Sequence, residues 1–209
     1  MMKRWALWMV GVLTVLVGAL YGVNAAILFM VQPVNVQAGD MGEFAERYDG
    51  VQLIVLDDLK SGGVGNLAVE AMGYVNVLSS EQVIYVDRTV AEKSSSYVGY
   101  FINHEYAHVA QKKLIAQEMG GYPSVDNPWF SMAYYAKALE LNSTLDSLMP
   151  VAEGVNDHSP FDGLEKMADC AAQSPENADR KLEYVGHAQC TVEQKQIALA
   201  VKDGVWPGR

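Results

Sequence analysis

The amino-acid sequence predicts an α+β fold, with an N-terminal transmembrane helix followed by a small, mainly helical domain that contains a short sheet. Three observations lead to this prediction. An apolar run near the N-terminus carries no charge, two short runs of strand-forming residues come next, and capped helix patterns fill the remainder. A chain of 209 residues has room for one anchor and one domain of ordinary size, residues 43–209.

The apolar run, residues 5–31, is long enough to span a bilayer. At about 1.5 Å of rise per residue, a helix of this length exceeds a hydrocarbon core of about 30 Å. Lys3 and Arg4, in the tip formed by residues 1–4, favour a cytoplasmic N-terminus, which places the domain outside the cell membrane. Residues 32–42 contain one proline and two glycines and are interpreted as a linker.

A cleaved signal peptide is the alternative interpretation of the same segment. Small residues at Val36-Gln37-Ala38 offer a cleavage site, and cleavage there would release a secreted protein. The apolar region of a signal peptide is typically about 7–15 residues long, much shorter than this run, so the sequence favours the uncleaved anchor. Both interpretations export the domain.

The exported part of the chain is acidic. Without Lys3 and Arg4 it holds 13 basic and 25 acidic residues, a formal net charge of −12. This charge disfavours nucleic acid and anionic lipid surfaces as partners. The sequence leaves the oligomeric state open.

The exported part also holds both cysteines, Cys170 and Cys190. An even number of cysteines in an oxidising compartment favours one disulfide bond. It would close a loop of about 20 residues and contribute about 3 kcal/mol by restricting the unfolded chain. A zinc site built from these two residues would need further ligands.

Two short apolar runs, residues 51–56 and 82–87, are typical of strands, and residues 74–78 give a weaker third candidate. Asp57 follows the first run and ends it. The glycine-rich residues 61–66 are interpreted as a turn, because no Gly-Lys-Ser/Thr follows that would make a phosphate-binding loop.

Cap signals divide the second half of the chain into about five helices. The expected starts, in order, are the serines 94–96, Asn127-Pro128, Ser159-Pro160, Ser174-Pro175 and a capping box from Thr191 to Gln194. The expected stops are Gly120-Gly121, Pro150 and Gly204.

His104 and His108 carry the first candidate chemistry. They are four residues apart in a helical pattern, so both imidazoles project from one face. Their nitrogens could bind one zinc ion at about 2.0–2.1 Å. Glu105 points off this axis and could take a proton from the water that a hydrolytic zinc site activates. The alternative is a pair of solvent-facing histidines.

A catalytic zinc site needs a third protein ligand. The metzincin pattern fails, because Gln111 and Leu114 stand where it requires glycine and histidine. Glu165 and Asp169, one helical turn apart, form an acidic pair whose repulsion calls for a cation. The alternative is an ordinary acidic helix face with Lys166 nearby.

His-Glu-Tyr-Ala-His-Val-Ala-Gln at 104–111 and Glu-Lys-Met-Ala-Asp-Cys at 165–170 resemble the gluzincin-type zinc metallopeptidases, in particular bacterial membrane-anchored neutral zinc metallopeptidases. The resemblance implies a zincin-like domain. It implies one catalytic Zn²⁺ held by His104, His108 and Glu165, with Asp169 fixing a ligand imidazole.

The same resemblance implies hydrolysis of peptide bonds in a peptide or protein substrate, with Glu105 as the general base. His187 and His158 are candidates to stabilise the transition state, or else ordinary surface histidines. Strand 82–87 is a candidate for edge pairing with an extended peptide. The alternative functions are a catalytically inactive exported module that binds zinc or a partner, and an adaptor without metal.

Overall fold

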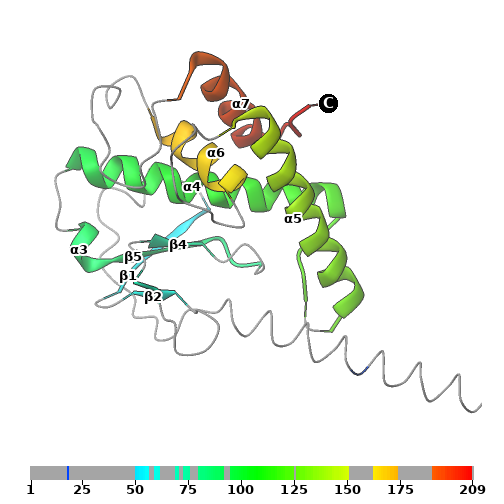
Figure 1. Ribbon diagram of the computed structural model, residues 1–209. Helices are drawn as coiled ribbons and strands as arrows, with labels where there is room; N and C mark the ends of the chain where they lie inside the picture. The colour runs from blue at the N-terminus through cyan, green and yellow to red at the C-terminus, as the bar shows by residue number, and fades with distance from the viewer. Residues whose placement is uncertain are drawn as a thin grey trace, which may run out of the picture.

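The computed structural model describes residues 50–56, 59–61, 69–70, 73–75, 80–91, 95–124, 126–150, 162–173 and 190–208, together with Gly18. Over these residues the chain is mostly helical and contains a small three-stranded sheet, which confirms the α+β prediction. Figure 1 shows the long helix α4 (Ser95–Met119) between the sheet on one side and helices α6 (Asp162–Ala172) and α7 (Val192–Lys202) on the other.

The sheet has the strand order β1-β5-β4. Strand β1 (Gln52–Leu56) runs parallel to β5 (Val83–Asp87), and β4 (Gly73–Tyr74) pairs with β5 in the antiparallel direction. The two main strand predictions are confirmed, while the third strand is shorter than expected and begins one residue earlier. A separate antiparallel pair joins β2 (Lys60–Ser61) and β3 (Val69–Glu70).

The central position of β5 corrects one expectation. Its neighbours β1 and β4 pair with it from both sides, so β5 does not offer the free edge that an added peptide strand would need. The two outer strands of this sheet are β1 and β4.

Local cap signals define several helix ends. Helix α4 ends at Met119, and Gly120 follows with a φ of 75°. Asn127 caps α5 (Pro128–Leu148) by accepting a hydrogen bond from the Phe130 backbone N–H at 3.1 Å. Thr191 and Gln194 form the predicted capping box of α7.

The expected starts at Ser159-Pro160 and Ser174-Pro175 lie outside the described residues. The one-turn helix α3 (Arg88–Ala91) was not expected. Asp87 begins it, because its Oδ1 accepts hydrogen bonds from the backbone N–H and the hydroxyl of Thr89.

Helix α4 is buried on two faces. Phe101, Ile102 and Val109 pack against the sheet, while Ala107 and Leu114 pack in a second cluster with residues of α5, α6 and α7. Since both faces exclude water, α4 forms the centre of the domain, and side chains between it and its neighbours are held in fixed positions.

Helix α6 is fixed closely against α5. A Cβ placed on Gly163 would lie 2.6 Å from the backbone nitrogen of Asp146, so only glycine allows this approach. Asn142 accepts a hydrogen bond from the Leu164 backbone N–H at 3.1 Å. The predicted disulfide between Cys170 and Cys190 is confirmed and ties α6 to the residue before the cap of α7.

Among the described residues, no helix combines the length and the apolar composition needed to cross a bilayer. The expected tip, anchor and linker, residues 1–4, 5–31 and 32–42, lie outside the described residues apart from Gly18. The transmembrane anchor therefore stays a prediction.

Candidate metal centre

Three of the predicted site residues meet where α6 packs on α4. His104 and His108 are buried on α4, and Glu165, with a side chain that is 39% exposed, comes from α6. One ligand atom from each residue lies within 4.8 Å of the others, so the group could hold a metal ion.

The three ligand atoms form a nearly equilateral triangle. The two histidine Nε2 atoms are 3.2 Å apart. Glu165 Oε2 lies 3.3 Å from His104 Nε2 and 3.5 Å from His108 Nε2. All three atoms therefore surround one common position.

Asp169 sets the orientation of the first imidazole. Its Oδ1 lies 2.9 Å from His104 Nδ1 and also accepts a hydrogen bond from the Tyr100 hydroxyl at 3.0 Å. An ionised carboxylate can only accept, so the His104 Nδ1 carries the hydrogen and its Nε2 presents a lone pair.

Gln111 sets the orientation of the second imidazole, a role that the sequence interpretation missed. Its Nε2 donates to the Leu164 carbonyl at 2.8 Å, which turns its Oε1 toward His108 Nδ1, 2.9 Å away. His108 therefore also presents a lone pair at Nε2. The available signal was the spacing, since Gln111 follows His108 by three residues on the same helix face.

The consequence is that three acceptors face one another. With both Nδ1 hydrogens donated elsewhere, neither Nε2 atom can donate to the other or to Glu165 as long as both imidazoles are neutral. Lone pairs at such short range repel one another unless a proton or a metal cation lies among them.

The pKa values describe the metal-free centre. Burial lowers the pKa of His104, but hydrogen bonds with Asp169 and Glu165 outweigh burial and hold this pKa well above its usual value of 6.5. Burial raises the pKa of Glu165, but attraction to His108 and His104 outweighs it and holds this pKa well below its usual value. The centre without metal therefore takes up a proton, and a metal ion has to displace it.

Glu105 lies beside this triangle, toward the sheet. A Cβ placed on Gly73 of β4 would lie 2.6 Å from Glu105 Oε1, so the carboxylate rests against the outer strand. Burial raises the pKa of Glu105, and the attraction of His104 and His108 opposes this only in part. A buried carboxylate with a raised pKa is a stronger base than an exposed one.

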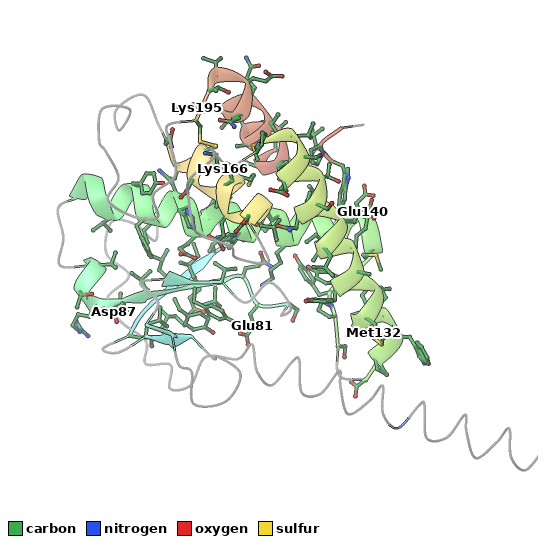
Figure 2. All side chains as sticks on the ribbon, in the orientation of Figure 1. Glu81, Asp87, Met132, Glu140, Lys166 and Lys195 are labelled. Atoms are coloured by element: carbon green, nitrogen blue, oxygen red, sulfur yellow. A yellow bond between two sulfur atoms is a disulfide. The ribbon has the colours of Figure 1, made fainter. Side chains whose placement is uncertain are left out.

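The alternative interpretation, an ordinary acidic helix face with Lys166 nearby, does not fit the burial of Asp169. Asp169 and Lys166 are each only 2% exposed, and the ammonium group of Lys166 is attracted to Asp169. Figure 2 shows where Lys166 lies on α6. The centre holds three carboxylates, on Glu105, Glu165 and Asp169, and one ammonium group, on Lys166. Their net charge is −2, which one divalent cation would balance.

Two further candidates, His187 and His158, lie outside the described residues, so their role in stabilising a transition state stays a prediction.

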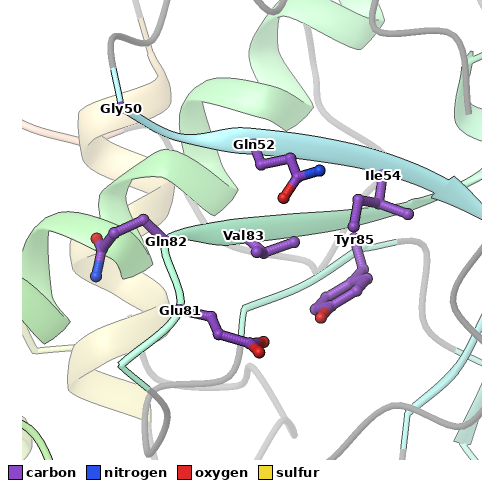
Figure 3. Close-up of a pocket in the computed structure, with 7 residues that line it drawn as sticks. All are labelled: Gly50, Gln52, Ile54, Glu81, Gln82, Val83 and Tyr85. Atoms are coloured by element: carbon purple, nitrogen blue, oxygen red, sulfur yellow. The ribbon is translucent and has the colours of Figure 1, made fainter. Parts of the chain in front are cut away.

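A pocket of about 550 Å³ lies on the other face of the sheet from α4. Figure 3 shows the side chains that line it. Those of Glu81, just before β5, and Tyr85, within β5, lie on the same side, while Gln82 points away from them. Ile54, Val83 and Tyr85 belong to a cluster separate from the one that packs on α4. The pocket is therefore no part of the metal centre.

No family model matches the chain, and no curated protein and no solved structure is significantly similar to it. The function is therefore argued from the chemistry of this centre and from the resemblance of its two short motifs.

Proposed function

We propose that this protein is a zinc-dependent peptidase, held in the cell membrane by residues 5–31 with its catalytic domain outside. The observation that carries the proposal is the triangle of acceptor atoms on His104, His108 and Glu165. The anchor rests on the apolar run in the sequence. The disulfide between Cys170 and Cys190 supports an oxidising compartment for the domain.

The size of the triangle supports zinc. In a tetrahedral site with bonds of 2.0–2.1 Å, neighbouring ligand atoms are about 3.3–3.4 Å apart, and the observed separations are 3.2, 3.3 and 3.5 Å. Two histidines and one carboxylate also bind iron(II), and the resemblance of the two motifs to zinc metallopeptidases favours zinc over iron. Calcium and magnesium prefer more ligands, all oxygen.

Zinc with three protein ligands keeps a position open for water or substrate and, when bound, supplies Lewis acidity to the scissile carbonyl and the attacking water. Glu105 would take the proton of that water on its carboxylate and deliver it to the nitrogen of the leaving amine. Asp169 and Gln111 would keep the two imidazoles in position through both proton transfers.

The position of β4 supports a peptide as the substrate. This outer strand lies against the Glu105 carboxylate at Gly73, so the sheet borders the general base. The resemblance to zinc metallopeptidases points to the same substrate class.

The proposal is tested with the full chain, purified in detergent with its disulfide oxidised, on a mixture of unrelated peptides. The Glu105→Gln protein should keep its zinc and lose at least about a hundredfold in kcat/KM, because the base is removed and no ligand is. Equal activity in both proteins would remove Glu105 from the mechanism. A zinc-loaded wild type that cleaves none of the peptides would favour the inactive binding module instead.

A further inference from the structure

The start of α5 and the connection before it form an aromatic tip, which we define as residues 120–136. Figure 1 shows this end of α5 extending beyond α4 and the sheet, and Figure 2 shows Met132 there, far from Lys166 on α6. The tip therefore lies at an extremity of the domain and takes no part in the metal centre.

The aromatic tip exposes two large apolar side chains. Trp129 is 57% exposed and Met132 is 37% exposed. They are three residues apart on α5, so they lie on the same face of the helix. Tyr122 and Phe130, also in the tip, are only partly buried. Tryptophan and tyrosine are the side chains most enriched at membrane interfaces.

Charge sets the tip apart from the rest of the domain. The exported part carries a formal net charge of −12, yet residues 120–136 contain Asp126 as their one charged residue. An acidic surface is repelled by anionic headgroups, so a nearly uncharged, aromatic segment is the part of this domain best suited to approach lipid.

Several polar groups of the tip are paired with one another. The Ser131 hydroxyl accepts from the Ser124 N–H at 3.1 Å and donates to the Ser124 carbonyl at 2.9 Å. Asn127 satisfies the N–H of Phe130, and the Ser124 hydroxyl satisfies that of Asp126. Groups that are already hydrogen-bonded cost little to move out of water.

A second copy of the chain is a poorer occupant for this surface. A stable dimer interface buries roughly 800 Å² on each partner. A tryptophan buries about 150–250 Å² even when it is covered completely, so Trp129 and Met132 offer only a fraction of that area.

We propose that the aromatic tip rests in the interfacial layer of a zwitterionic lipid bilayer, with Trp129 and Met132 among the headgroups and upper acyl chains. The expected linker, residues 32–42, spans at most about 40 Å and would keep the domain near the membrane. Together, anchor and tip would hold the domain in one orientation. This second contact goes beyond the proposed anchor and does not depend on catalysis.

The test uses the full chain in phosphatidylcholine nanodiscs, with Trp5, Trp8 and Trp206 replaced by phenylalanine so that Trp129 is the sole fluorophore. The fluorescence emission of Trp129 should lie to the blue of that of a solvent-exposed tryptophan. Lipid brominated on the acyl chains should quench this emission by at least about half. The matched control carries Trp129→Phe and Leu199→Trp, because Leu199 on α7 is 50% exposed and lies outside the tip.

Equal and weak quenching of the two probes would overturn the proposal. A blue-shifted Trp129 that brominated lipid does not quench would also overturn it, because the tip would then be covered by protein. Neither readout involves zinc or peptide cleavage, so failure here leaves the proposed peptidase intact, and failure of the peptidase leaves this test valid.

Discussion

Two buried polar regions lie one turn apart on α4, and they are built in opposite ways. At His108 the acceptors of the metal centre face one another. At Lys112 the buried ammonium finds its partners within the protein, since it donates to the Glu81 carbonyl and lies 5.9 Å from the centre of the Tyr122 ring. The Tyr134 hydroxyl also donates to the Lys112 carbonyl.

The difference separates a structural polar group from a binding site. Lys112 and its partners match donor to acceptor, which is what a buried group needs for stability alone. The centre at His104, His108 and Glu165 places acceptor against acceptor, which costs stability unless a cation is added. The metal centre therefore needs an added cation, a proton or a metal ion, and the Lys112 region does not.

Removal of the third ligand, Glu165, should have the largest effect on zinc binding. Glu165→Ala should weaken zinc binding by at least about a hundredfold, because one of three protein ligands is lost. Chelator competition measures the affinity. Asp162→Ala is the matched control, an acidic residue in the first turn of the same helix and outside the ligand group, and it should leave the affinity unchanged. Equal losses in the two variants would show that general charge matters and coordination does not.

The residues that orient the imidazoles should have a smaller effect. Asp169→Asn and Gln111→Leu should each weaken zinc binding about 10- to 100-fold, because each frees one ligand histidine to rotate or to change tautomer. Tyr100→Phe removes the other hydrogen bond to Asp169 Oδ1 and should change the affinity less than Asp169→Asn. Unchanged affinity in all three variants would contradict the orienting role.

The pH dependence of stability should differ between the metal-free and the zinc-loaded protein. The raised pKa of His104 stabilises the metal-free fold below about pH 6.5, and this contribution is lost as the pH rises through the pKa of the folded state. Stabilisation by zinc should instead grow with pH, because fewer protons compete for the imidazoles. Urea unfolding at several pH values, with zinc or with chelator, measures both trends. If stability changed with pH in the same way with zinc and with chelator, the expected competition between protons and zinc would be contradicted.

Replacement of Lys112 should have the smallest effect. It should change the pH dependence of stability, and this change should not depend on metal. Burial lowers its pKa from 10.5 to about 8, so between these values the unfolded chain holds a proton that the folded protein has released. Its contribution to stability therefore rises across this window. The difference in unfolding free energy between wild type and Lys112→Met should rise from pH 8 to pH 10.5, with or without zinc. A constant difference would contradict the burial argument.

Local signals explain why the helices could be predicted from the sequence. The Asn127-Pro128 start, the capping box at Thr191 and the glycine after Met119 act within a few residues, so their effect does not depend on the rest of the fold. Strand β4 was less predictable, because its two residues form a strand only through pairing with β5.

The candidate centre was predictable only in part. The spacing of His104 and His108, and that of Glu165 and Asp169, indicates which side chains share a helix face. How the two faces meet depends on the packing of α6 on α4 and α5, where Gly163 sets the approach. The role of Gln111 depends on the Leu164 carbonyl of that neighbouring helix, so the sequence alone could not supply it.

The central claim is that the acceptor triangle is completed by one zinc ion, and metal occupancy tests it most directly. The full chain is stripped of metal and exposed to equal concentrations of zinc, iron(II), magnesium and calcium, and native mass spectrometry counts the bound ions. We expect one zinc per chain in the wild type and none in a protein carrying His104→Ala and His108→Ala. A wild-type chain that binds none of these metals, or a variant that binds zinc equally well, would contradict it.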